Sequence, residues 1–304
     1  MLTASTRNNN LLVKASLQYT GLPPTGQNAA LRDEDHLALA AACEPGTGLC
    51  TIVGIEGSFS RSIGAQLAIR ADGSIAGSLS DGCLEQQLAR DCAEASASVV
   101  RRYGKGSQVI DFRLPCGAGL DILVDPEPDR KACLSVLDAL QRRQAATLAL
   151  PGDGKLKRRV YLPPLAVTAY GDGPELAAFS AIGRAAGIAV EAIDKGTLSI
   201  GRPSGHAMAD EWTAVVMLFH DHEWEIALLE EALAGRAFYI GAQGGAQARL
   251  QRLKELRRRG AVQSALARIR SPVGTPRGSR TPQTLALAAL AEITSEYERL
   301  RPGA

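Results

Sequence analysis

The chain has 304 residues, a formal net charge of +2, and 45% hydrophobic against 22% charged residues, a globular composition with room for two domains. The near-neutral charge excludes nucleic acid as the main partner, and no apolar run approaches the roughly 18 residues of a membrane span. Residues 1–10 are polar and lack the apolar core of a secretory signal, so we expect a cytoplasmic protein. In that reducing compartment the six cysteines are expected as free thiols, ligands or nucleophiles, and no CxxC spacing supports a structural zinc site.

The sequence of the first half of the chain predicts an N-terminal extension followed by a compact domain. Residues 1–32 are rich in Asn, Thr, Gly and Pro without periodicity, which predicts a flexible N-terminal extension. Residues 33–160 predict a mixed sheet with few helices, and the triplet 71–73 is a hairpin turn. The expected helices are 33–42, 85–100 and 130–143, and the expected strands are 51–55, 66–69, 74–79, 109–114 and 120–124, with a hairpin over 147–162.

The second half, residues 161–304, begins at the pair Pro163-Pro164, which marks a boundary. Strands and helices then alternate, a pattern typical of a parallel sheet with right-handed crossovers. We therefore predict an α/β protein in which a Rossmann-like domain follows the mixed-sheet domain. The final helix is expected to start at Thr281-Pro282 and to run to about residue 300.

The first candidate site is the loop 56–64, which leaves a strand. It carries Ser58, Arg61 and Gly64, so backbone N–H groups and a guanidinium could face an anion. A surface turn with a solvated arginine is the alternative.

The second candidate is the segment 78–85, where a strand ends in a glycine turn and a helix begins. Gly82, Cys83 and Glu85 lie at this junction, and a helix N-terminus stabilises a thiolate. A buried cysteine that acts as a small hydrophobic residue is the alternative.

The third candidate is the segment 114–121, in which Cys116 is followed by Gly117 in a glycine-rich bend between two strands. Glycines on both sides allow a bulky group to approach the sulfur, whereas a tight hairpin with an incidental cysteine is the alternative. Two such bends in one domain lead to the hypothesis that Cys83 and Cys116 face one site.

The second domain offers a fourth candidate, the turn 170–176 between a strand and a helix. Gly171 and Gly173 would cradle a phosphate, and Asp194 would bind a ribose. Leu176 replaces the third glycine of the dinucleotide pattern, so a Rossmann turn without a nucleotide is the favoured alternative.

Two further segments are given structural interpretations. His220 and His222 lack a third metal ligand nearby, and Asp221 is explained as a helix cap. The basic residues of 249–259 alternate with leucines and are predicted to form the solvent-exposed face of an amphipathic helix: Arg249, Arg252, Lys254, Arg257, Arg258 and Arg259.

Three ordered segments, 57–67, 77–85 and 114–123, together with 238–242, 267–274 and 279–282, resemble the XdhC and CoxI family of molybdenum-cofactor maturation proteins. The resemblance implies a maturation chaperone, with enzyme activity left open, that binds molybdenum cofactor transiently and delivers it to the apoenzyme of a molybdenum hydroxylase such as xanthine dehydrogenase. It implies Cys83 and Cys116 as metal ligands and a cofactor site that also includes Ser58, Arg61, Gly64, Gly82, Glu85 and Gly117. A homodimer and a cysteine desulfurase partner are further expectations.

Two rival functions stay open. A nicotinamide-dependent oxidoreductase would bind NAD(P) at Gly171, Gly173 and Asp194, whereas a docking module would bind a hydroxylase without touching its cofactor. Departures from the family pattern at Gly244, Gly245 and Ala246 weaken the case for an anion site on the second domain.

Overall fold

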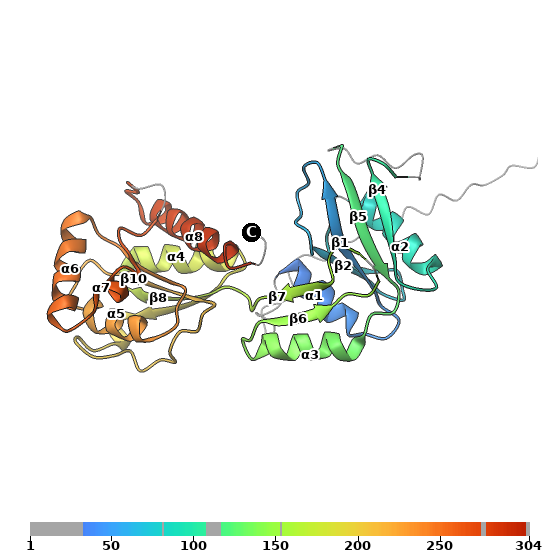
Figure 1. The fold of residues 1–304 in the computed structure, drawn as a ribbon. Coiled ribbons are helices and arrows are strands. Elements are labelled where there is room, and N and C mark those ends of the chain that lie inside the picture. Colours follow the sequence, from blue (N-terminus) through green and yellow to red (C-terminus); the bar gives the residue numbers. More distant parts are fainter. Residues whose placement is uncertain (1–32, 81, 108–116, 153, 275–277, 302–304) are drawn as a thin grey trace, which may run out of the picture.

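The computed structural model describes residues 33–80, 82–107, 117–152, 154–274 and 278–301. They form two five-stranded sheets and a small two-stranded sheet, each covered by helices (Figure 1). The α/β class is therefore confirmed, and the predicted extension 1–32 lies outside the described residues.

The first sheet has the order β3-β2-β1-β5-β4, and every neighbouring pair is antiparallel. This refines the mixed sheet expected from the sequence. Its elements are α1 (Glu34–Ala42), β1 (Gly48–Glu56), β2 (Gln66–Ile69), β3 (Ile75–Gly77), α2 (Cys83–Glu94), β4 (Val99–Gly104) and β5 (Gly119–Asp125).

Side-chain alternation along β1 explains why both faces of this sheet are covered. Cys50 and Ile52 pack with α2 residues such as Leu88, whereas Leu49 packs on the opposite face with α1 and α3 (Arg130–Gln141). A bulge between Ile52 and Gly54 shifts the register with β5. Almost the whole strand is buried as a result, so β1 is the centre of the first lobe.

A short hairpin of β6 (Ala146–Ala149) and β7 (Arg158–Tyr161) follows α3 and confirms the hairpin predicted over 147–162. Tyr161 and Leu148 join the core formed by α1 and α3. The hairpin therefore covers the face of the first sheet that lies opposite α2.

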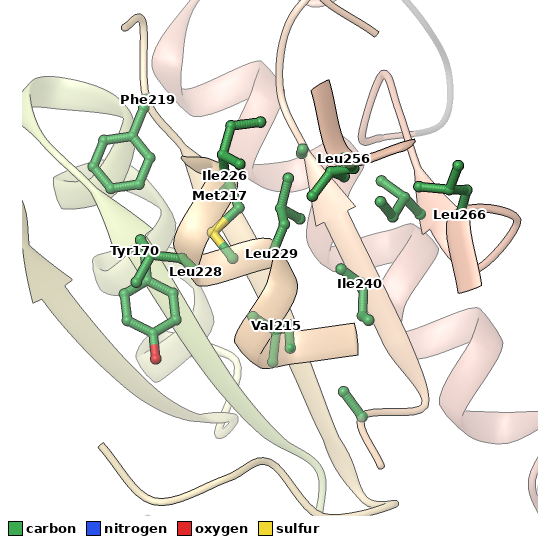
Figure 2. Close-up of a cluster of buried hydrophobic side chains, with 14 of the residues drawn as sticks. Tyr170, Val215, Met217, Phe219, Ile226, Leu228, Leu229, Ile240, Leu256 and Leu266 are labelled. Atoms are coloured by element: carbon green, nitrogen blue, oxygen red, sulfur yellow. The ribbon is translucent and has the colours of Figure 1, made fainter. Parts of the chain in front are cut away.

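The second sheet has the order β12-β11-β10-β8-β9 with all pairs parallel, as predicted for a Rossmann-like unit. Helices α4 and α8 cover one face, and α5, α6 and α7 cover the other (Figure 1). Figure 2 shows Val215 and Met217 of β10 beside Ile226 and Leu229 of α5. The elements are β8 (Ala166–Gly171), α4 (Gly173–Ala185), β9 (Ala189–Asp194), η1 (Lys195–Thr197), β10 (Thr213–Leu218), α5 (Glu225–Ala234), β11 (Tyr239–Ala242), α6 (Ala246–Arg258), α7 (Gln263–Leu266), β12 (Ile269–Arg270) and α8 (Pro282–Glu298).

The helix predicted over 85–100 is wrong at its C-terminal end. Helix α2 stops at Glu94, and residues 99–104 form β4, which pairs with β5. The β-branched pair Val99-Val100 favours a strand over continuation of the helix. The strand predicted over 109–114 lies outside the described residues.

Polar contacts connect the two lobes. Arg143, whose φ is +58°, donates from Nε to Asp210 over 2.5 Å and from Nη1 to the carbonyl of Pro164 over 2.8 Å. Within the second lobe, the Tyr297 hydroxyl donates to the carbonyl of Pro163, where the chain enters this lobe, over 2.6 Å. The domain boundary at residues 160–161 stays a prediction.

Candidate functional site

The antiparallel order of the first sheet brings its glycine-rich connections to one end. Strands β1, β3 and β4 end there, while β2 and β5 begin there, so the segments 57–65, 78–80, 105–107 and 117–118 share that end. Glu56 is opposite Gly119 across β1 and β5, and a Cβ on Gly57 would lie 3.7 Å from Cα of Ala118. The first and third of the predicted loop sites are therefore neighbours.

Cys83 is the first residue of α2, in agreement with the prediction for this junction. Gly82 precedes it with φ +103°, a conformation that favours glycine because it has no Cβ. The Cys83 side chain is exposed at the N-terminus of α2. The alternative interpretation of a buried structural cysteine is therefore wrong.

The other described cysteines lie in less accessible surroundings. Burial raises the pKa of the Cys133 thiol to about 12, and a hydrogen bond to Cys92 together with burial raises the pKa of Cys50 well above its ordinary value. Cys43 is half-buried at the end of α1, and burial raises its pKa as well. Among the described thiols, Cys83 is thus the one presented to solvent.

Glu85 fixes the loop that leads to Cys83. Its carboxylate accepts hydrogen bonds from the backbone N–H groups of Leu79 at 3.0 Å, Ser80 at 2.5 Å and Gly82 at 2.8 Å. The side chain is only 5% exposed. Since both carboxylate oxygens already accept from the loop, Glu85 positions the loop and the thiol, and its place in a cofactor site stays a prediction.

The loop 56–64 is fixed by ion pairs with neighbouring elements. Arg61 pairs with Glu34 at the start of α1, so its guanidinium already has a carboxylate partner. Gly64 has φ +93°, and a Cβ there would lie 3.0 Å from Cδ of Arg159. Ser58 is exposed on the same loop. An anion at Arg61 would therefore have to compete with Glu34.

Cys116 lies outside the described residues, so the expected convergence of Cys83 and Cys116 stays a prediction. The neighbouring Gly117 is exposed with φ +69°, and a Cβ added there would meet nothing within 4 Å. In the part of the chain that the structure describes, no three His, Cys, Asp or Glu side chains are grouped as metal ligands.

A cavity of about 510 Å³ opens at the same end of the first sheet. It is lined by residues of β1, β4, β5, the loop 56–64 and the hairpin connection: Val53, Gly54, Ile55, Glu56, Ile63, Arg102, Asp121, Lys155 and Leu156. Most of these residues were not predicted from the sequence. Asp121 is the last residue of the third candidate segment, 114–121. Its position opposite Arg102 depends on β4, whose residues were predicted as helix and loop.

The turn 170–176 of the second sheet follows β8, as predicted, but its polar groups have intramolecular partners. Asp172 pairs with Lys195, and Asp194 accepts from the N–H of Gly196 over 2.8 Å at the start of η1. Gly171 is needed because a Cβ there would lie 2.6 Å from the carbonyl oxygen of Leu218. These contacts give the turn a structural role, and NAD(P) binding through Gly171, Gly173 and Asp194 stays a prediction.

Arg252 is not on a solvent-exposed face, so that prediction was wrong. Its side chain is completely buried, and its Nε donates to Glu225 over 2.7 Å. Burial, only partly offset by Arg252, raises the pKa of Glu225. Asp221 accepts from the N–H of Glu223, while Trp224 is the residue before α5, so Asp221 does not cap that helix.

The fold and the site define a two-lobed α/β protein with an exposed thiol among glycine loops on one lobe and a Rossmann-like sheet in the other. Residues 43–104 match the model of the XdhC and CoxI family, and residues 167–293 match that of the XdhC Rossmann domain. The chain is 31% identical over 295 residues to the molybdenum cofactor insertion chaperone PaoD of Escherichia coli K12, with 88% of this chain and 91% of PaoD covered. The chain belongs to the XdhC and CoxI family.

Two other proteins are similar to the chain. The uncharacterized protein YqeB of Escherichia coli K12 is 26% identical over 253 residues, which cover 81% of this chain and 42% of YqeB. A crystal structure described as a xanthine dehydrogenase from Bacillus halodurans superposes with a TM-score of 0.67 at 18% identity, covering 90% of this chain and 97% of that one. That likeness supports the fold. Separately, none of the helices formed by the described residues is long and apolar enough to span a bilayer.

Proposed function

We propose that the protein binds molybdenum cofactor at the loop end of the first sheet and inserts it into a molybdenum hydroxylase such as xanthine dehydrogenase. The name of its relative PaoD, a molybdenum cofactor insertion chaperone, supports cofactor handling and a molybdoenzyme partner. The observation that carries the proposal is the exposed Cys83 thiol at the start of α2, on a loop fixed by Glu85.

The chemistry of this position suits a soft metal or sulfur centre. Cysteine sulfur is a soft ligand, which matches a soft metal or a sulfur centre. An added Cβ at Gly117 would meet nothing within 4 Å, so a bulky ligand can approach the backbone there. Because Cys83 is at the surface, a bound cargo would stay accessible to an acceptor protein.

Cofactor retention tests the first half of the proposal. The full chain is incubated anaerobically with molybdenum cofactor, passed through a desalting column, and assayed for retained molybdenum and pterin. We expect retention by the unmodified chain and a loss of most of it in Cys83→Ser. Cys43→Ser is the matched control, since Cys43 is a half-buried thiol at the end of α1. Equal retention in Cys83→Ser and the unmodified chain would contradict the proposed role of Cys83 in cofactor binding.

Transfer tests the second half. The loaded chain is mixed with the cofactor-free apoenzyme of xanthine dehydrogenase, and the return of hydroxylase activity is followed against the same amount of free cofactor. Faster or fuller activation by the loaded chain supports insertion. Activation no better than with free cofactor contradicts the chaperone role. Storage of the cofactor would then be the function that accounts for its retention.

The remaining partner expectations are proposals of lower rank. NAD(P) binding can be checked by calorimetric titration, in which saturable micromolar binding would support the oxidoreductase alternative. A hydroxylase pull-down that persists without any cofactor binding would support the docking alternative. The cysteine desulfurase contact, the homodimer and the cytoplasmic location stay predictions.

A further inference from the structure

We propose that Cys50 of β1 and Cys92 of α2 are a redox-active pair, which a hydroperoxide oxidises to a disulfide that joins the helix to the strand. Both thiols are free in the structure. In the reducing compartment expected from the sequence, disulfides are mostly transient and serve redox sensing or catalysis. The proposal does not depend on cofactor binding, although it concerns the same helix that presents Cys83 at its start.

Both sulfur atoms lie on the face of the first sheet that α2 covers. Cys50 and Cys92 belong to the core between that face and the helix, together with Leu84 and Leu88. The Cys50 thiol donates a hydrogen bond to the sulfur of Cys92. A disulfide bond of about 2.05 Å therefore needs only a small approach of two sulfur atoms that are already in contact.

A glycine on β1 makes room for the Cys92 sulfur. Residues 48, 50 and 52 face the same side of the sheet, because side chains alternate along a strand. A Cβ on Gly48 would lie 2.3 Å from Sγ of Cys92, so a larger residue at this position would displace the sulfur. The sulfur of Cys92 therefore lies over β1 next to the Cys50 side chain, and this contact is independent of the hydrogen bond.

The surroundings favour Cys92 as the sulfur that reacts first. The hydrogen bond from Cys50 lowers the pKa of Cys92, although burial and Asp125 oppose this effect. Because the thiolate is the nucleophile, a lowered pKa favours attack on an oxidant. Cys50 is completely buried, whereas Cys92 is 8% exposed and lies close to the end of α2 at Glu94. Local opening of the helix end admits a small oxidant there.

The oxidation balances with one molecule of hydrogen peroxide, the simplest hydroperoxide. The Cys92 thiolate attacks one peroxide oxygen, an S–O bond forms as the O–O bond breaks, and the leaving hydroxide takes the proton released by Cys92 to become water. The Cys50 sulfur then attacks the sulfur of this sulfenic acid. An S–S bond forms as the S–O bond breaks, and the hydroxide leaves as a second water with the Cys50 proton. The two thiols lose two electrons, and the peroxide gains them.

The disulfide would attach α2 to the central strand of the first lobe. It closes the chain between residues 50 and 92, a span that contains β2, β3 and the start of α2. A cross-link over such a span restricts the unfolded chain, so the oxidised lobe should unfold about 5–15 °C above the reduced lobe. Oxidation would therefore strengthen the attachment of the helix that presents Cys83.

Peptide mapping of the full chain tests the proposal. The reduced protein is treated with a small excess of hydrogen peroxide, the remaining thiols are blocked with N-ethylmaleimide, and the digest is analysed by mass spectrometry. We expect a linked pair of peptides that contain Cys50 and Cys92, about 2 Da lighter than the two reduced peptides together. Dithiothreitol should separate the pair, and calorimetry should show the higher unfolding midpoint before this reduction.

Two variants test the order of the steps. Alanine keeps the site apolar, and calorimetry of the reduced variants checks that the lobe is folded. In Cys50→Ala, oxidation of Cys92 should stop at the sulfenic acid, which dimedone labels. In Cys92→Ala, dimedone labelling of Cys50 should be at least about tenfold weaker, because Cys50 is the completely buried thiol.

Cys43 and Cys133 are the matched control, since they are neighbouring cysteines in another core of the same lobe. The Cys43 thiol donates to the carbonyl of Leu39 over 3.4 Å, and burial raises the pKa of Cys133 to about 12. This pair should give at least about tenfold less linked peptide under the same conditions.

The results separate a redox pair from two cysteines that only fill the core. A link between Cys50 and Cys92 that reverses with dithiothreitol, exceeds the control link and raises the unfolding midpoint supports the proposal. It is overturned if peroxide oxidises Cys83 while the pair stays reduced, or if Cys43 and Cys133 become linked to the same extent. Cofactor retention enters neither result, so failure of this proposal and failure of the proposed function are distinguishable.

Discussion

Replacing Arg252 by methionine should strongly destabilise the second lobe. The guanidinium is completely buried and contacts Glu225 at 2.7 Å, Ser271 at 2.8 Å and the carbonyl of Gln243 at 2.8 Å. Methionine fills much of the same space but leaves the buried Glu225 carboxylate without the guanidinium, so that His222 Nδ1, at 3.3 Å, is its remaining ion-pair partner among the described residues. Removing one partner of a buried pair costs about 3–5 kcal/mol, because the remaining charge is uncompensated.

The stability lost in Arg252→Met should increase as pH rises. Burial already raises the pKa of Glu225 in the presence of Arg252, and removal of the guanidinium raises it further. For an acid with a raised folded-state pKa, stability is fully present below the unfolded pKa and is lost as pH rises through the folded pKa. The deficit of Arg252→Met relative to the unmodified chain should therefore be larger at pH 8 than at about pH 5.

Thermal unfolding measured by calorimetry at several pH values checks this reasoning. At about 2–4 °C per kcal/mol, the midpoint of the second lobe should fall by about 6–20 °C at neutral pH. Arg258→Met on the same helix is the control, since Arg258 is exposed and pairs with Glu255 at the surface. A double variant Arg252→Met with Glu225→Leu should regain most of the loss. A deficit that does not change with pH, or one as small as in Arg258→Met, would refute the argument.

The remaining predictions concern the first lobe and its contact with the second. Glu85→Ala removes the acceptor of three loop N–H groups and should lower the free energy of unfolding by about 1–3 kcal/mol, with weaker cofactor retention in the desalting assay. Gly77→Val should greatly reduce the yield of folded protein, because φ is +85° and a Cβ would lie 2.9 Å from a carbonyl oxygen. Burial opposes ionisation of Asp210, but hydrogen bonds from Arg143 and Thr213 hold its pKa below the ordinary value. Its contribution to stability is thus present above the unfolded pKa of about 3.9 and is lost as pH falls through the lowered folded-state pKa, so the stabilities of Asp210→Asn and the unmodified chain should converge there.

The parallel sheet of the second lobe was predictable from the sequence, because strands and helices alternate there with glycine turns between them. The helix that was predicted over 85–100 failed because local propensity does not show where a helix stops in favour of a strand whose partner, β5, lies some 20 residues further on. Helix α6 shows a second limit. Its leucines suggested one buried stripe, yet Leu250 is exposed and Arg252 is buried beside Leu256. Hydrophobic periodicity along a helix does not reveal that one of its basic side chains, Arg252, pairs with the buried carboxylate of Glu225.

The candidate site was predictable in its local features and unpredictable in its contacts. The position of Cys83 at a helix start followed from the glycine turn before it, and the structure places the helix there. The partners of Glu85 and Arg61 could not be read from the sequence, because they depend on loop conformation and on α1. The cavity depends on the pairing of β4 with β5, which the sequence analysis did not anticipate.

Asp33 and Arg301 lie at opposite ends of the described chain, yet they contact each other at 2.8 Å. Asp33 also caps α1 by accepting from the N–H of Asp35, so the end of the chain stabilises the start of the first helix. Cutting the chain between its lobes would leave this cap without its cation and Arg143 without Asp210. An isolated N-terminal fragment is therefore a poor substitute for the full chain in binding experiments, and fusions are better designed with both lobes intact.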